Sequence, residues 1–404
     1  MMGGPLGFFL LAASALAAPA EVSALLSRLG DADLVVMNNP QTARPVRVLL
    51  ATRVAARPRV VRRIVTSPAS YGEAMPSFRR VDLLARRKGQ SGQTDLEVAW
   101  ELDVPLWNLE GKLWLRPRRD GADLELAEGD FAPGLFHVSV RGEQAGKRER
   151  AILTIEGHAN VRDANLATRQ LVQRSALAEP AMTVAAAYVM LKSLARLAEE
   201  GAPGRPRAAM SSAEPSTLDG TRTGAAVPAC LPAAALLAAV RSKPDGRLAR
   251  VEVALPLSLA GTKAAAAVHS PETFRALPGW KKVATVTAEP KVCTDPLAPC
   301  WAVENDLPLF SLDGIWKVRQ RPWRARMVAG ERQGALMGID LVPSPSPGSS
   351  MMVLSEHPRL DRAGYAARKL IAAEPYLEHG LALALTLVEA TSLQRAFEAS
   401  ANIR

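Results

Sequence analysis

The sequence predicts an α+β protein built from two tandem copies of one unit, each a curved antiparallel sheet wrapped around a long C-terminal helix. The first observation behind this prediction is a repeat: residues 103–116 (DVPLWNLEGKLWLR) recur 203 positions later as residues 306–319 (DLPLFSLDGIWKVR). The second is a series of alternating stretches with no helical pattern between them, which indicates antiparallel strands. The third is a long helical pattern at the end of each copy.

The repeat extends to other parts of the chain, since residues 67–71 correspond to residues 270–274. A period of about 200 residues is far longer than the roughly 20 to 50 residues of solenoid repeats. The repeat therefore predicts two globular domains, residues 19–200 and a diverged second copy at residues 229–404.

The first half of the first copy combines helices with a strand. A short helix is expected near residues 21–29 and a strand at residues 47–54. Two short helices follow at residues 58–65 and 68–74, because each segment places proline at the first helical position, where its missing N–H costs nothing.

Residues 95–104 carry the clearest pattern in the chain. Leu96, Val98, Trp100 and Leu102 alternate with acidic and small residues, which is typical of a strand with one buried face. Pro105 cannot donate to a sheet and ends this strand. Further strands are expected near residues 109–116, 124–126, 135–140 and 150–155.

Each copy closes with a predicted helix. In the first copy this helix covers residues 165–199, and Pro180 is expected to kink or interrupt it. In the second copy, residues 381–388 would also fit a strand, but leucine and alanine favour a helix and the repeat agrees. Residues 201–228 between the copies are rich in Gly, Pro, Ser and Thr, which predicts a flexible linker that lets the domains move.

The N-terminus and the cysteines indicate export. Residues 1–18 contain an apolar run and a small-residue cleavage pattern, which predicts a signal peptide and a periplasmic or secreted protein. No later segment was expected to hold the ~20 apolar residues that cross a bilayer. Cys293 and Cys300 flank a loop with two prolines and an aspartate, so we expect a disulfide at a hairpin tip. Cys230 is expected to be an unpaired apolar residue.

The net charge of +10 comes with several arginine runs. Solvated surfaces are the favoured explanation, and an anionic membrane surface is the alternative partner. Nucleic-acid binding is not expected, because no recognition motif or stacking pattern accompanies the runs. The chain also lacks a phosphate loop, a nucleophile elbow and metal-ligand spacing, so no cofactor and no metal are expected. We expect a monomer.

The predicted order of elements resembles that of the helix-grip fold, and the chain is similar to the START-like (SRPBCC) superfamily of polyketide cyclase/dehydrase, lipid-transport and coenzyme Q-binding proteins. Residues 67–81, 104–109 and 128–136 carry the resemblance in the first copy, and residues 270–274 and 307–312 carry it more weakly in the second. These motifs mark positions in the fold. The resemblance implies a cavity between sheet and helix that takes an apolar ligand.

The expected binding residues lie on the inward face of the sheet and on the helix that covers it, although each of them could equally fill a core. In the first copy they are Trp100, Leu102, Leu113, Leu115, Phe136, Val138, Tyr188 and Leu191, and in the second copy Leu309, Leu312, Ile315, Val318 and Leu387. The favoured function is non-enzymatic binding or transport of an apolar or amphipathic small molecule, such as a lipid or quinone.

Two alternatives stay open. One is a cyclase- or dehydratase-like enzyme, for which His158 and His357 fall at equivalent positions of the two copies and are candidate acid or base groups. No catalytic residue is assigned, because the sequence places no carboxylate beside either histidine. The other alternative is an interaction module with filled interiors.

Overall fold

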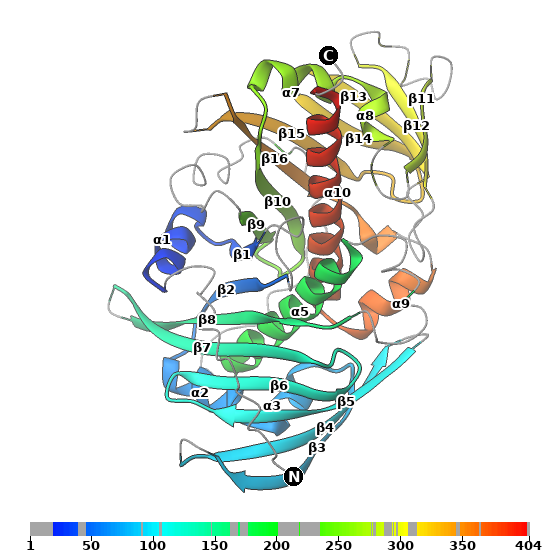
Figure 1. Ribbon diagram of the computed structural model, residues 1–404. Helices are drawn as coiled ribbons and strands as arrows, with labels where there is room; N and C mark the ends of the chain where they lie inside the picture. Colours follow the sequence, from blue (N-terminus) through cyan, green and yellow to red (C-terminus); the bar gives the residue numbers. More distant parts are fainter. Residues whose placement is uncertain are drawn as a thin grey trace, which may run out of the picture.

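A computed structural model gives the architecture of the chain. It describes residues 19–38, 46–89, 92–104, 107–146, 148–161, 177–200, 235–275, 280–286, 298–305, 313–344, 348–362 and 365–401, and the single positions 169, 218, 277, 293 and 295. The described strands form one continuous antiparallel sheet of 16 strands. It runs from β3 at the bottom of Figure 1 to β11 at the top.

The first unit starts with α1 (Pro19–Leu29) and ends with α5 (Ala178–Glu200). Two short helices, α2 (Pro58–Val65) and α3 (Pro68–Ala74), both begin with proline as predicted. Its strands in chain order are β1 (Asp33–Asn38), β2 (Val48–Val54), β3 (Phe78–Lys88), β4 (Thr94–Val104), β5 (Trp107–Pro117), β6 (Gly121–Gly129), β7 (Gly134–Ala145) and β8 (Arg148–Ala159).

The second unit repeats this order. Its helices are α7 (Gly261–Val268), α8 (Pro271–Phe274), the 3-10 helix η2 (Leu360–Arg362), α9 (Tyr365–Ala373) and α10 (Leu377–Ala401). Its strands are β9 (Ala235–Ser242), β10 (Leu248–Leu257), β11 (Trp280–Val286), β12 (Cys300–Asn305), β13 (Gly314–Gln320), β14 (Trp323–Gly330), β15 (Leu336–Pro343) and β16 (Ser350–His357). Residues 381–388 lie in α10, so the helix expected there is confirmed.

The strand order is the same in both halves. It reads β1-β2-β8-β7-β6-β5-β4-β3 in the first unit and β9-β10-β16-β15-β14-β13-β12-β11 in the second. In each half a strand pair, two short helices, a run of antiparallel strands and a long closing helix follow one another, which is the helix-grip order. The predicted fold class, two tandem α+β units that each combine an antiparallel sheet with a long closing helix, is therefore confirmed.

The two units are joined by sheet and by helices. β1 pairs with β9 in antiparallel register from Asp33↔Val240 to Asn38↔Ala235. On the side where both closing helices lie, α5 packs against α10 (Figure 1). The helices approach so closely that a Cβ atom on Gly380 would lie 2.9 Å from the backbone oxygen of Ala185. The expected movement between domains is therefore wrong for the parts of the chain that the structure describes.

The linker and the signal peptide fall largely outside these residues. Residues 1–18 are not described, so the signal peptide and the export that it implies stay predictions. Within residues 201–228 the structure describes Leu218, which is buried.

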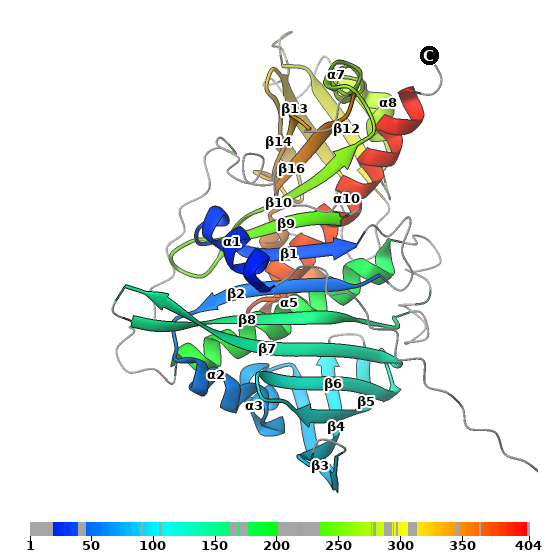
Figure 2. The same cartoon turned by 60° about the vertical axis from the view of Figure 1, so that its left-hand side comes forward.

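The opposite side of the central strands is covered by α1, which lies in front of β1 and β9 in Figure 2. Val22, Leu25, Leu26 and Leu29 of this helix form a second apolar cluster with the outward residues of the central strands. β1 is therefore buried on both faces, and its run of apolar residues shows no alternation. For this reason the sequence did not predict it as a strand.

Three details differ from expectation. Pro180 lies in the first turn of α5, where a missing N–H is tolerated, and the described helix continues from Ala178 to Glu200. Cys293 and Cys300 are joined in a disulfide with Cα atoms 5.4 Å apart, but the sheet partners of Cys300 are Val286 and Lys317, so the bond does not join paired strand positions. α5 is long and apolar enough to cross a membrane, contrary to expectation, although most of its apolar stretch is buried inside the protein.

Candidate functional site

The candidate site is the inner face of the first unit's sheet, opposite α2, α3 and α5. Leu115, Phe136, Val138 and Leu191 are buried there and belong to the main apolar core. Leu102 and Leu113 are half-buried on the same face. These six predicted residues are therefore brought to one surface, with the sheet supplying most of them.

Trp100 is the largest side chain on this face and is 5% exposed. Its indole lies across Gly111 of the neighbouring strand, because a Cβ atom there would lie 2.8 Å from ring carbon Cζ2. The ring also stacks on Phe131 at a centroid distance of 6.1 Å. The indole N–H of Trp100 is buried and has no hydrogen-bond partner among the described residues.

Part of the inner face remains open. Val81, Leu96, Leu113 and Leu126, on four adjacent strands, are half-buried and pack against the core from its margin. On β3, two positions after Val81, Leu83 is 40% exposed, although its cross-strand neighbour Val98 is buried. The closing helix α5 packs instead against β2 and β8, farther along the sheet, while the short helix α3 packs against β3 and reaches Val81. The result is an apolar surface at the β3–β6 end of the unit that its own helix leaves partly uncovered.

Tyr188, also expected on the inner face, belongs to the junction between the units. Its hydroxyl donates to Asp33 at 2.6 Å, and its ring stacks on His379 of α10 with centroids 6.2 Å apart. Asp33 also accepts hydrogen bonds from Thr52 at 2.5 Å and from the Lys192 ammonium at 3.1 Å. Burial lowers the pKa of Lys192, but the Asp33 carboxylate outweighs it and raises that pKa overall.

The second unit fills the corresponding space with aromatic rings. Phe274 is fully buried and lies 5.1 Å from Trp301 and 5.0 Å from Trp323 between ring centroids. Trp280 is 6.1 Å away, and Trp316 is buried in the same core. By the repeat, Trp301 and Trp316 stand where the first unit has Val98 and Leu113, whereas Phe274 corresponds to the buried Tyr71. The interior of the second unit therefore holds large rings at two positions that are aliphatic in the first unit.

The binding residues predicted for the second unit lie in different environments. Val318 and Leu387 are buried in this core, while Leu309 and Leu312 lie outside the described residues. Ile315 is half-buried and not part of the core, and the inward residue is its neighbour Trp316. Ile315 and Val318 are three positions apart, so a regular strand places them on opposite faces. The irregularity beside them lies in β14, where Val328 is the extra residue between Met327 and Ala329. The repeat itself aligns Trp316 with Leu113.

A pair of buried carboxyl groups in the second unit was not anticipated. Glu389 of α10 lies beside Glu356 of β16, which accepts a hydrogen bond from Thr386 at 2.9 Å. Burial, and then the neighbouring Glu356, raise the pKa of Glu389 well above its usual value. Arg332 is also buried there, and burial lowers its pKa to about 10. The signal in the sequence is that Glu389 directly follows the apolar residues 381–388 of the helix.

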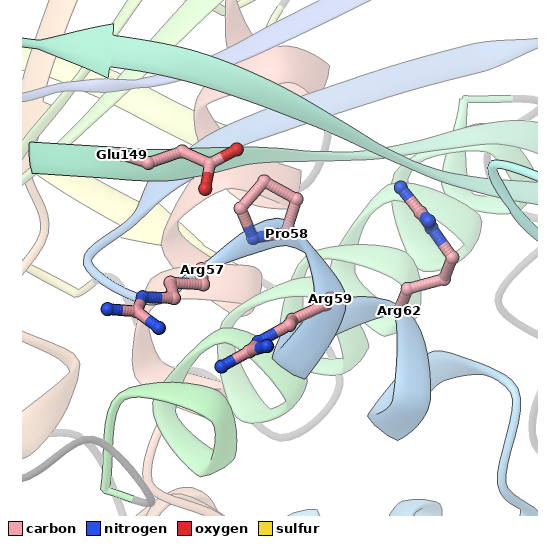
Figure 3. Close-up of a pocket in the computed structure, with 5 residues that line it drawn as sticks. All are labelled: Arg57, Pro58, Arg59, Arg62 and Glu149. Atoms are coloured by element: carbon pink, nitrogen blue, oxygen red, sulfur yellow. The ribbon is translucent and has the colours of Figure 1, made fainter.

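A pocket of about 350 Å³ lies elsewhere, at the start of α2. Arg57, Pro58, Arg59, Arg62 and Glu149 line it (Figure 3). The guanidinium group of Arg62 points away from those of Arg57 and Arg59, so the three cations do not converge on one point. None of the predicted binding residues lines this pocket.

His158 and His357 lie at equivalent places, near the ends of β8 and β16, in separate units. Burial lowers the pKa of His158. Burial, helped by nearby cations, lowers the pKa of His357 to about 4. The structure therefore does not bring the two candidate acid or base groups together, and each is neutral at pH 7.

These environments predict the order in which the histidines titrate. His137 donates a hydrogen bond from Nδ1 to the Asp123 carboxylate at 2.7 Å, and this hydrogen bond raises the His137 pKa above 6.5. We expect imidazole NMR signals to show His137 titrating first as pH falls, then His158, with His357 and His379 both near pH 4. Since a buried neutral histidine resists protonation more in the folded than in the unfolded state, both deep histidines destabilise the fold as pH falls from 6.5 towards 4. Asp123→Asn should lower the pKa of His137 alone, and an unchanged His137 would contradict the assignment.

Comparisons with known proteins find solved structures that are similar to this chain, but no matching family profile and no matching curated sequence. The di-domain aromatase/cyclase StfQ from the steffimycin biosynthetic pathway is 11% identical, with 88% of this chain and 98% of that chain covered and a TM-score of 0.28. A START superfamily protein from Mycobacterium smegmatis is 14% identical, covering 38% of this chain and 97% of its own, with a TM-score of 0.27. The Zhui aromatase/cyclase from Streptomyces sp. R1128 is 16% identical, covering 38% and 93%, with a TM-score of 0.26.

Proposed function

We propose that the first unit binds an apolar or amphipathic small molecule, such as a lipid or a quinone, on the inner face of its sheet. The observation that carries this proposal is the partly uncovered apolar surface on β3–β6, which includes Val81, Leu96, Leu113 and Leu126. Exposed apolar area costs about 25 cal/mol per Å², so a ligand that covers this surface is stabilised by removing it from water.

The contrast between the two units supports the same assignment. Side chains on the inward register of β4 are apolar from Leu96 to Leu102, so the face favours binding over acid–base chemistry. In the second unit Phe274 and its tryptophan neighbours occupy the interior, so the second unit serves a structural role in this proposal. The cyclase- or dehydratase-like alternative, and the expectation that the chain is not an enzyme, both stay predictions.

The proposal is tested with a charge placed on the inner face. Leu113→Asp should weaken uptake of a fluorescent fatty acid or quinone probe by at least about tenfold, because a carboxylate loses its hydration when an apolar ligand covers it. Leu135→Asp is the matched control, since Leu135 is 44% exposed and lies on the outer face of β7, across from Glu125. Thermal unfolding of both variants shows whether each is folded.

Purified full-length protein should also release a bound apolar molecule on solvent extraction and mass spectrometry. Absence of any such molecule, together with no probe uptake by the wild type, would refute the binding function. Equal losses in Leu113→Asp and Leu135→Asp would show that the inner face is not the site.

A further inference from the structure

Among the described strands, β3 is an edge of the sixteen-stranded sheet and pairs with β4 on one side. It is exposed over most of its length, and two consecutive leucines, Leu83 and Leu84, are 40% and 47% exposed. Large apolar side chains on a free strand edge normally favour association. In the same strand lie five cationic residues, Arg79, Arg80, Arg86, Arg87 and Lys88.

The cations on the two faces of β3 have different surroundings. On the outer face Arg80 pairs with Asp82, and Arg87 lies 3.5 Å from Asp95 and 3.7 Å from the Trp114 ring centroid. On the inner face Arg86 is opposite Leu96 and Lys88 is opposite Thr94, so no carboxylate occupies their cross-strand positions. Both side chains are exposed. The inner rim of β3 therefore combines exposed leucine with cations that no facing acid neutralises.

The exposed leucines and the cations together decide which kind of partner fits the β3 edge. A second copy pairing through β3 would bring Arg86 and Lys88 near the same cations of its partner strand, and Asp82, the one acid in the strand, already pairs with Arg80. A surface that is both anionic and apolar would instead satisfy the cations and cover the leucines. We propose that the β3 rim docks the protein on an anionic lipid membrane, with Arg86 and Lys88 at the headgroups and Leu83 and Leu84 inserted between them.

The docking surface adjoins the candidate binding face. Leu83 lies across from Val98, and Val81 lies across from Trp100 on the same inner face. Docking through β3 thus places the open end of that face at the membrane surface. The proposal does not depend on ligand binding, because vesicle association is measured without any added ligand.

The test is co-sedimentation of full-length protein with vesicles of phosphatidylcholine, with and without phosphatidylglycerol. The wild type should bind the anionic vesicles and lose binding as salt increases. Arg86→Glu/Lys88→Glu should bind at least about 25-fold more weakly, since each cation near an anionic surface contributes about fivefold. Leu83→Ser/Leu84→Ser should bind about tenfold more weakly, because less apolar area is inserted.

The matched control is Arg319→Glu/Arg321→Glu, the same charge change at exposed residues of the second unit. It should bind within about twofold of the wild type, because it lies far from the β3 edge. The proposal is overturned if the wild type does not bind anionic vesicles, or if the control variant loses as much binding as the β3 variant. It is also overturned if sedimentation shows a dimer that Arg86→Glu/Lys88→Glu disperses, or if a polyglutamate peptide binds β3 while vesicles do not.

Discussion

Replacing Asp33 with alanine is expected to lower the free energy of unfolding by about 3–5 kcal/mol. The Asp33 carboxylate accepts hydrogen bonds from Tyr188, Thr52 and Lys192. Its removal leaves the Lys192 ammonium, which is 19% exposed, without the charge that compensates its burial. Two buried hydroxyls lose an acceptor at the same time, and each such loss costs about 1–3 kcal/mol.

Urea denaturation followed by circular dichroism measures this effect. Asp31→Ala is the matched control, because Asp31 is exposed two positions earlier and should change stability by less than about 0.5 kcal/mol. The double variant Asp33→Ala/Lys192→Met should recover part of the loss, since it removes the uncompensated charge. If Asp33→Ala unfolds with the wild-type midpoint, the polar cluster at the junction does not stabilise the protein.

Phe274→Ala is expected to cost about 3–5 kcal/mol, the range for removing a buried aromatic ring. Phe274 contacts Trp280, Trp301 and Trp323, with ring centroids 5.0–6.1 Å away. Rings of this size cannot collapse into the vacated volume without leaving their rotamers, so a cavity remains.

Phe274→Leu should lose less stability than Phe274→Ala, because it retains most of the apolar volume. Tyr365→Ala is the control for loss of an aromatic ring, since Tyr365 is 68% exposed and should change stability by less than about 0.5 kcal/mol. Equal melting temperatures for Phe274→Ala and Tyr365→Ala would contradict the packed interior of the second unit.

The sequence predicted those elements whose structure depends mainly on residues close together in the chain. The alternation of residues 95–104 gave β4 with Val98 and Trp100 buried, and the prolines at positions 58 and 68 gave the starts of α2 and α3. The repeat extended the same fold to the second unit. In each case the information lies within a few residues or in the comparison of two segments.

The junction could not be predicted in the same way. The pairing of β1 with β9 joins residues 200 positions apart, and no periodicity encodes which edge pairs with which. Tyr188 was expected to oppose the inner face of the sheet, because its position on the helix fits. Its hydroxyl instead donates a hydrogen bond to Asp33 at the start of β1. Trp316 was missed because Ile315 was chosen together with Val318, although an odd spacing along a strand places two residues on opposite faces.

The antiparallel contact between β1 and β9 also bears on ancestry. Two equivalent edges that meet antiparallel are what a two-fold homodimer of a single-unit ancestor would present to itself. Fusion of two such genes makes association independent of concentration and lets the paralogous halves diverge. In this chain the second half carries Trp301 and Trp316 where the first half carries Val98 and Leu113.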